Sequence, residues 1–278
     1  MTLAQHELRA MYGFLERNLN LVKRYWGWEV VWIAYSVANS IAVVLVARSA
    51  NAAAGTEAFD EAAVERLVLF LSVGAVVWHY VSVVFGTVAQ MVALERWEGT
   101  IEYTFMAPVR RITHLVGTSL FAIVYALVHT AVILAVIVAV FGIDVGRADF
   151  GAAAAVMVAG SLSLIGIGMM GAVLPLLYPE RGEQMAWVIQ AALLLVSGVY
   201  ALPEHMPEPL RTLADFSPVT YLLAAMRDAV LDGAGVADIW PTAAGLFAAG
   251  LGLIPAGVWV FTQGERYAKR SGRLKRSG

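Results

Sequence analysis

Few side chains in this sequence are spaced in a way that supports chemistry. Gly166, Gly168 and Gly171 have the spacing of a dinucleotide-binding loop, but the segment around them is apolar. It has no preceding strand and no acidic residue about 20 positions later, as that loop requires. None of the three lysines follows a glycine, so the sequence also lacks a phosphate-binding loop. The chain therefore has no recognisable means of hydrolysing a nucleotide.

Other catalytic and metal-binding patterns are missing as well. The sequence has no cysteine, its five histidines have no paired metal-ligand spacing, and no serine lies in a G-x-S-x-G motif. His79 and His129 lie within apolar segments, where a polar group is a candidate for function. A proton relay and a hydrogen bond to a neighbouring helix are both open for them. We expect neither an enzyme nor a metal site.

The composition instead indicates a membrane protein. Of 278 residues, 60% are apolar and 14% are charged, and the mean hydropathy is +0.72, whereas soluble domains carry about 25% charged residues. Crossing a bilayer takes roughly 20 apolar residues in a helix. Charge-free segments predict a single all-α membrane domain, 1–278, with six transmembrane helices at approximately 30–47, 67–94, 115–142, 151–178, 185–202 and 240–262.

The distribution of basic residues predicts the orientation of these spans. If alternate loops lie on opposite sides, 14 of the 19 Lys and Arg residues fall on the side that holds both termini, and 5 fall on the other. Short cytoplasmic loops are enriched in Lys and Arg. Both termini are therefore expected in the cytoplasm, with 265–278 as a basic cytoplasmic tail.

Three segments outside the predicted spans have distinct patterns. In 1–28, apolar residues recur at helical spacing opposite charged ones, which predicts an amphipathic helix in the membrane interface. The loop from Leu94 to Glu102 carries closely spaced opposite charges, and Pro108 should end any helix near Ala107. The segment 203–233 is interrupted by four prolines yet remains apolar, which predicts short helices that dip into the outer leaflet.

The predicted spans contain no Asp, Glu, Lys or Arg. That argues against ion-coupled transport through a charged site in the membrane, because such sites use ionisable side chains. A large amphiphilic cargo fits the uncharged interior better. Gly160, Ser161 and Ser163, with the three glycines named above, are expected to let the fourth span approach its neighbours closely.

Together these segments resemble the permease subunit of type-2 ATP-binding-cassette exporters. The specific matches are E-G-T-I-E followed by P-V-R-R in the second cytoplasmic loop, and S-G-V-Y, L-P, S-P-V-T-Y and R-D-A between spans five and six. The resemblance covers nearly the whole chain. It implies a multi-pass protein of a prokaryotic cytoplasmic (inner) membrane that exports a drug, lipid or glycolipid.

The resemblance also implies partners. Such permeases pair, usually as homodimers, and each binds a separate ATPase subunit that carries ATP and Mg, while the permease holds no cofactor. The ATPase-coupling region would comprise Glu95, Arg96, Glu98, Gly99, Thr100 and Glu102. The connecting helix beside it would carry Arg9, Arg17, Lys23 and Arg24 on its charged face.

A substrate path and an outer gate are implied in the same way. The path lies along the second and fifth spans in this family, which makes Trp78, His79, Tyr80, Gln90, Trp187, Gln190, Ser197 and Tyr200 candidate lining residues. Ordinary helix packing is the alternative for each. The outer gate would include Pro203, Pro218, Tyr221 and Arg227. A nucleotide-independent membrane protein, either a secondary transporter or an assembly scaffold, remains the alternative function.

Overall fold

The computed structural model describes residues 3–53, 61–142 and 145–272, and this part of the chain is helical with no strand. The first half consists of α1 (Leu3–Arg24), α2 (Trp26–Ala53), α3 (Glu61–Ala89), α4 (Met91–Trp97), α5 (Ile101–Met106) and α6 (Arg111–Phe141). The second half consists of α7 (Phe150–Gly171), α8 (Val173–Leu177), α9 (Gly182–Val196), the 3₁₀ turn η1 (Pro203–His205), α10 (Glu208–Asp215), α11 (Pro218–Leu231) and α12 (Val236–Arg270).

Five segments are long and apolar enough to cross a membrane, and they match five of the six predicted spans. They are Trp26–Val46, Arg66–Ala89, Arg111–Phe141, Phe150–Leu177 and Val236–Arg270. The predicted span 185–202 corresponds to α9, which has only 15 residues because the chain turns at Gly198, where φ is +79°. At 1.5 Å per residue, α9 is shorter than the roughly 30 Å hydrocarbon layer.

The structure moves two other predicted boundaries. The second span was expected to reach residue 94, but α3 ends at Ala89 and the new helix α4 begins at Met91. Residues 265–270 of the predicted tail 265–278 continue α12, which ends at Arg270, and Glu265 is buried. Its last basic residues, from position 273 on, lie outside the described residues.

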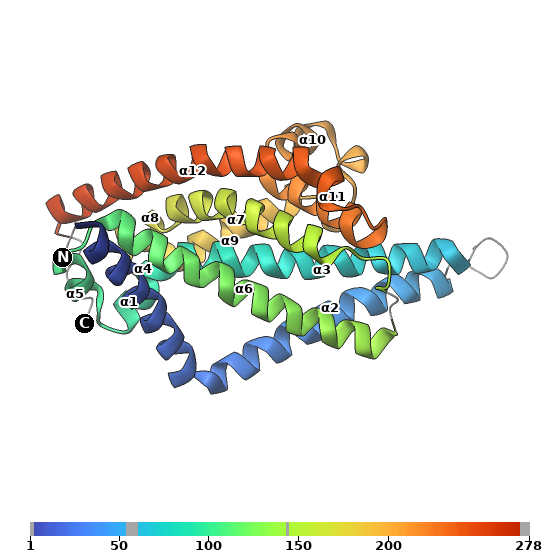
Figure 1. Ribbon diagram of the computed structural model, residues 1–278, viewed down its shortest axis with the longest axis horizontal. Coiled ribbons are helices and arrows are strands. Elements are labelled where there is room, and N and C mark those ends of the chain that lie inside the picture. Colours follow the sequence, from blue (N-terminus) through green and yellow to red (C-terminus); the bar gives the residue numbers. More distant parts are fainter. Residues whose placement is uncertain (1–2, 54–60, 143–144, 273–278) are drawn as a thin grey trace.

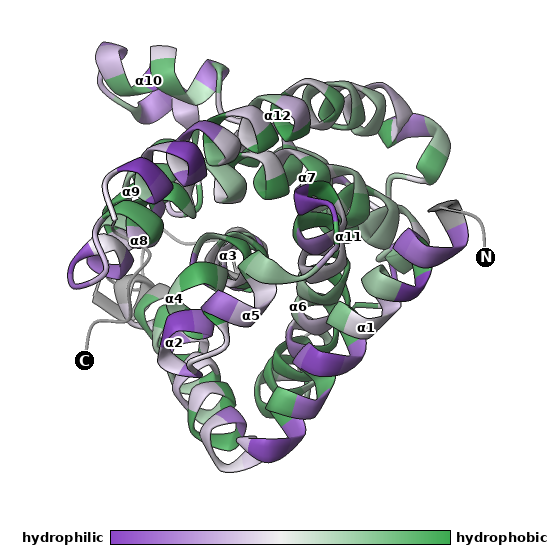
Figure 2. Ribbon diagram, turned by 90° about the vertical axis from the view of Figure 1, so that its left-hand side faces the viewer, coloured by the Kyte–Doolittle hydropathy of each residue, from purple (hydrophilic) through white to green (hydrophobic). Residues whose placement is uncertain are grey.

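The helices form an elongated bundle with α3 near its centre. Viewed along the long axis, α2, α6, α7 and α9 surround α3 (Figure 2), and α3 contacts all four of them. The start of α1 and the end of α12 lie at one end of the molecule with α4 and α5, while α11 lies toward the other end (Figure 1). The segments that share the first end are thus brought together from distant parts of the sequence.

Small residues hold α7 close to its neighbours, as the sequence predicted. A Cβ added to Gly166 would lie 2.5 Å from the carbonyl carbon of Leu253 in α12. A Cβ added to Gly168 would lie 2.9 Å from Val88 in α3. Both distances are too short for a side chain, so the backbones can approach this closely only because the positions are glycine.

Candidate coupling site

The predicted coupling loop is a helical hairpin formed by α4 and α5. Gly99 lies between the two helices at φ +70°, a left-handed conformation that strongly favours glycine. The short helix α5 ends at Met106, and Ala107 adopts an extended conformation before Pro108. The prediction that Pro108 ends the helix near Ala107 is confirmed, because proline disfavours the helical conformation in the preceding residue.

Glu95 fastens this hairpin to the rest of the protein. Its Oε1 accepts hydrogen bonds from Arg17 Nη1 in α1 at 2.7 Å and from His114 Nε2 in α6 at 3.0 Å. Arg17 also donates from Nη2 to the hydroxyl of Thr100 at 3.0 Å, and the Phe14 ring lies 4.7 Å from the His114 ring. Glu95 is 2% exposed. One buried carboxylate thus joins α1, α4 and α6.

The charge of Glu95 is maintained by these partners. Burial raises its pKa, but the hydrogen bond from His114 and the interactions with Arg17 together lower the pKa by more than burial raises it. The net pKa of Glu95 therefore lies below its ordinary value. Arg96, next to it, is half-buried and donates to the carbonyl of Leu176 in α8 at 3.2 Å. Burial lowers the pKa of Arg96. Both side chains therefore serve contacts within the protein.

Arg111 forms a second joint on the other side of the hairpin. Its guanidinium donates to the carbonyls of Thr104 at 2.9 Å and Phe105 at 2.6 Å, which satisfies the free carbonyl end of α5. It also contacts Glu265 of α12 at 3.2 Å, and Lys269 contacts the same carboxylate at 2.6 Å. The second arginine of the P-V-R-R motif thus connects α5, α6 and α12.

The predicted connecting helix α1 packs mainly against α6. Glu7 contacts Thr113 and Arg110, and a Cβ added to Gly117 would lie 3.0 Å from Phe14. The sequence placed Arg17 on a charged face in water, but Arg17 is turned inward to Glu95. Of the other predicted residues, Arg24 lies 3.7 Å from Glu98, while the side chains of Arg9 and Lys23 are exposed.

Burial divides the six predicted coupling residues into three groups. Glu95 is buried, Arg96, Glu98, Gly99 and Thr100 are partly buried, and Glu102 is exposed. The exposed surface around Glu102 also includes two large side chains that sequence reasoning missed, Tyr103 and Met106, each 73% exposed. A hollow of about 220 Å³ beside them is lined by Glu102, Met106 and Lys269 among others. We call Glu102, Tyr103 and Met106 the end patch.

The candidate path residues differ in how far they are buried. Tyr80 is fully buried and bonds to the carbonyl of Met157 at 3.2 Å and to Ser161, and Ser197 is buried and donates to the carbonyl of Leu194. These two residues follow the packing alternative. Trp78, Gln90 and Gln190 are half-buried. Trp187 on α9 and Tyr200, which follows α9, are exposed.

His79 and His129 belong to a polar cluster inside the bundle. Their rings stack with centroids 6.3 Å apart, and His129 Nε2 lies 3.5 Å from Glu29 Oε2, to which Tyr125 also donates. Glu29 lies within the candidate span Trp26–Val46. The predicted span 30–47 begins just after Glu29, whereas the candidate span begins at Trp26 and so includes this carboxylate.

The four gate residues are spread over the segment between α9 and α12. Pro203 begins η1 and Pro218 begins α11, while the Tyr221 hydroxyl donates to the carbonyl of Asp215 at 2.8 Å. Arg227 is buried, donates to the carbonyls of Gly198 and Val199 at 3.1 and 2.9 Å, and stacks on the Phe70 ring. Arg227 thus anchors the chain where α9 ends.

Sequence reasoning also missed His114 and Glu265. The available signal for each was a polar side chain inside or beside a long apolar segment. The residues that they contact, however, lie in other parts of the sequence. Arg111 and Glu265, for example, are 154 positions apart. Only the folded structure brings such residues together.

A known protein family matches most of the chain. A family model described as ABC-2 type transporter matches residues 19–231, which include α2 to α11 and the last six residues of α1. The chain belongs to the ABC-2 type transporter family. No curated protein matched the chain. An ABC-2 chain is the membrane component of a transporter, so family membership implies an ABC ATPase as its partner. Its apolar helices and its family together make it a multi-pass membrane protein.

Proposed function

We propose that this permease exports an amphiphilic or lipid-linked compound, such as a drug, a lipid or a glycolipid, with ATP hydrolysis on a partner subunit as the driving force. Two copies would pair as a homodimer in the cytoplasmic membrane of a prokaryote, each with one ATPase bound to ATP and Mg. Family membership supports the ATPase partner. Family membership also argues against a nucleotide-independent transporter or scaffold. Transport that continues without any ATPase would favour that alternative.

The end patch and its two buried joints carry this proposal. Glu102, Tyr103 and Met106 form an exposed, largely apolar surface on α5, which suits a contact with another protein. Behind this surface, Glu95 ties the hairpin to α1 and α6, and Arg111 ties it to α6 and α12. An ATPase that moves α5 would therefore move these long helices with it.

The other end of the bundle supports an outer gate. α11 packs along α7, where a Cβ added to Gly160 would lie 2.9 Å from Leu222. Gly160 is ten residues from the start of α7, so α11 reaches about 15 Å along it. We infer that α10 and α11 are the re-entrant elements that close the exit, and that the path runs along the half-buried side of α3 and the exposed side of α9.

Charge reversal on the end patch tests the docking step. Glu102→Arg and Tyr103→Ala should abolish co-purification of the permease with its cognate ATPase while leaving membrane insertion unchanged, because both side chains are exposed. Glu208→Arg on α10 is the matched control, since Glu208 is also exposed but lies in the proposed gate segment. Glu98→Arg should also weaken the association by breaking the 3.7 Å pair with Arg24. Normal association of both end-patch variants would refute the docking assignment.

A further inference from the structure

A pocket of about 530 Å³ lies in the angle between the α1–α2 corner and helices α3, α4 and α6. Figure 1 shows α2 diverging from α6 toward the corner where α1 ends and α2 begins. Part of its lining lies in candidate spans, including Trp32, Gly86 and Tyr125, and part lies outside them, including Trp97 on α4. The pocket therefore extends from the end of the bundle that carries α4 into the membrane region.

Aromatic side chains with a polar edge dominate the lining. Three tryptophans and two tyrosines contribute, namely Tyr25, Trp28, Trp32, Trp97 and Tyr125. The rings of Tyr25 and Trp97 are 5.3 Å apart, while Trp28 and Trp32 are more than half exposed. The faces of such rings carry partial negative charge and attract cations, most strongly in surroundings with little water.

The same pocket also carries negative charge. Glu29 and Glu183 line it, and no lysine or arginine is among the described lining residues. Glu29 accepts a hydrogen bond from the Tyr125 hydroxyl, and His129 Nε2 lies 3.5 Å from its Oε2. Lys23 and Arg24, which end α1 beside the lining residue Tyr25, are not in the lining, and Arg24 Nη1 lies 3.7 Å from Glu98 Oε2. Two carboxylates in a largely apolar pocket that no lysine or arginine lines favour a cationic ligand.

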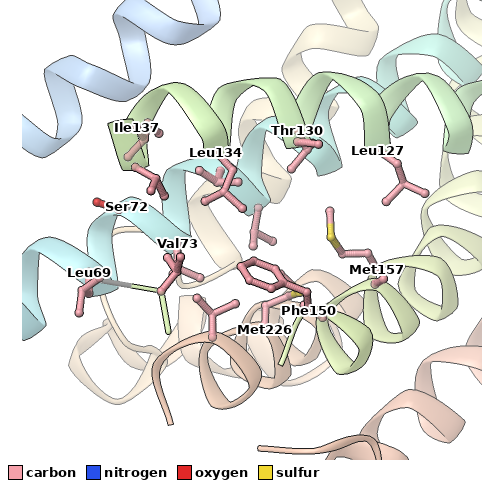
Figure 3. A pocket seen from close by; sticks show the side chains of 18 residues that line it. Leu69, Ser72, Val73, Leu127, Thr130, Leu134, Ile137, Phe150, Met157 and Met226 are labelled. Atoms are coloured by element: carbon pink, nitrogen blue, oxygen red, sulfur yellow. The ribbon is translucent and has the colours of Figure 1, made fainter. Parts of the chain in front are cut away.

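A second cavity lacks this combination. It holds about 210 Å³ between α3, α6, α7 and α11, and its lining is apolar except for Ser72 and Thr130 (Figure 3). The Ser72 hydroxyl donates to the carbonyl of Val68 in its own helix. That cavity offers no charge to a ligand and does not select one by its chemistry.

We propose that the pocket beside Glu29 binds a lipophilic organic cation, with the charged centre between the aromatic rings and the two carboxylates. The apolar body of the ligand would lie between α2 and α6, where Trp28 and Trp32 are exposed. This inference rests on the proposed export function and deepens it, because it names the class of cargo.

Tetraphenylphosphonium and tetraphenylborate provide the test, since they have nearly the same shape and opposite charge. Binding of each labelled ion to the purified permease in lipid nanodiscs, without ATPase, is measured by equilibrium dialysis against empty nanodiscs. We expect saturable binding of the cation only. Glu29→Gln should raise its Kd about tenfold or more, and Trp32→Leu should raise it about three- to fivefold.

Matched controls separate a local effect from a general one. Glu208→Gln and Trp240→Leu change an exposed glutamate and an exposed tryptophan outside the pocket and should leave the Kd unchanged. The proposal is overturned if the anion binds as well as the cation, if neither binds, or if the controls weaken binding as much as the pocket variants. If Glu29→Gln does not fold, Trp32→Leu against Trp240→Leu decides.

The outcome is independent of ATPase docking. Binding is measured without the ATPase. If the end-patch variants still associate with the ATPase, the coupling assignment is refuted and the pocket result still holds. Conversely, absence of cation binding beside normal loss of ATPase association would reject this cargo class alone.

Discussion

The joint at Glu95 allows a quantitative test of how the hairpin is held. The perturbation is a double-mutant cycle with Glu95→Gln, Arg17→Gln and the double variant, each of which keeps the approximate side-chain size. Removing one partner of a fully buried ion pair costs about 3–5 kcal/mol. Glu95 has 3% of its side chain exposed but Arg17 has 25%, so a released Arg17 can turn to water. We therefore expect a coupling energy of about 1–2 kcal/mol.

Amide hydrogen exchange of α1 is the assay, because the pair should control local opening of this helix rather than unfolding of the whole bundle. The control cycle uses Arg66→Gln and Asp232→Asn. That pair is separated by 3.8 Å, with side chains 78% and 59% exposed. Exposed pairs of this kind contribute about 0–1 kcal/mol. The reasoning is refuted if the Glu95 cycle gives a coupling no larger than the control cycle.

Three further predictions concern other parts of the same framework. Because the pKa of Glu95 is lowered in the folded state, its stabilising effect is complete above the unfolded pKa of about 4.3 and is lost only as the pH falls through the lower folded pKa. Protection of α1 amides from hydrogen exchange should therefore be constant from about pH 6 to 8 and decrease in acid. A loss of protection near neutral pH would contradict this. Arg111→Lys should loosen α5, since a lysine cannot bind Glu265 and two carbonyls at once, and limited proteolysis at the hairpin measures it against the wild type. Gly166→Ala should destabilise the bundle by about 1–3 kcal/mol through overpacking, seen as a lower melting temperature in detergent, whereas Gly252→Ala, with nothing within 4 Å, should not lower it.

Several features could be predicted from the sequence because their signals are local. Hydrophobicity over a segment is a property of that segment, so five of the predicted spans match helices that are long and apolar enough to cross a membrane. Glycine spacing in 160–171 predicted close packing before any partner was known, and Gly166 and Gly168 confirm it. Pro108 ended its helix as expected.

Other features could not be predicted because they depend on contacts between distant residues. The alternation of charges around Glu95 is equally compatible with an exposed helix face, and only the packing of α1 and α6 on α4 turns this residue inward. Its partners Arg17 and His114 are 78 and 19 positions away. The length of α9 is also decided by context, since Arg227 binds the carbonyls of Gly198 and Val199 at the turn that ends it.

By itself, the sequence determined that this chain is an all-helical membrane protein with its charge outside most of the apolar segments, and its motifs indicated the transporter family. Tertiary structure decided which charged residues hold the hairpin and which face outward, and it placed Glu29 within a candidate span beside Tyr125 and His129. The physical reason is that apolar transfer energies add up residue by residue along the chain. The energy of a buried charge, in contrast, depends on which partners the fold brings within hydrogen-bond distance.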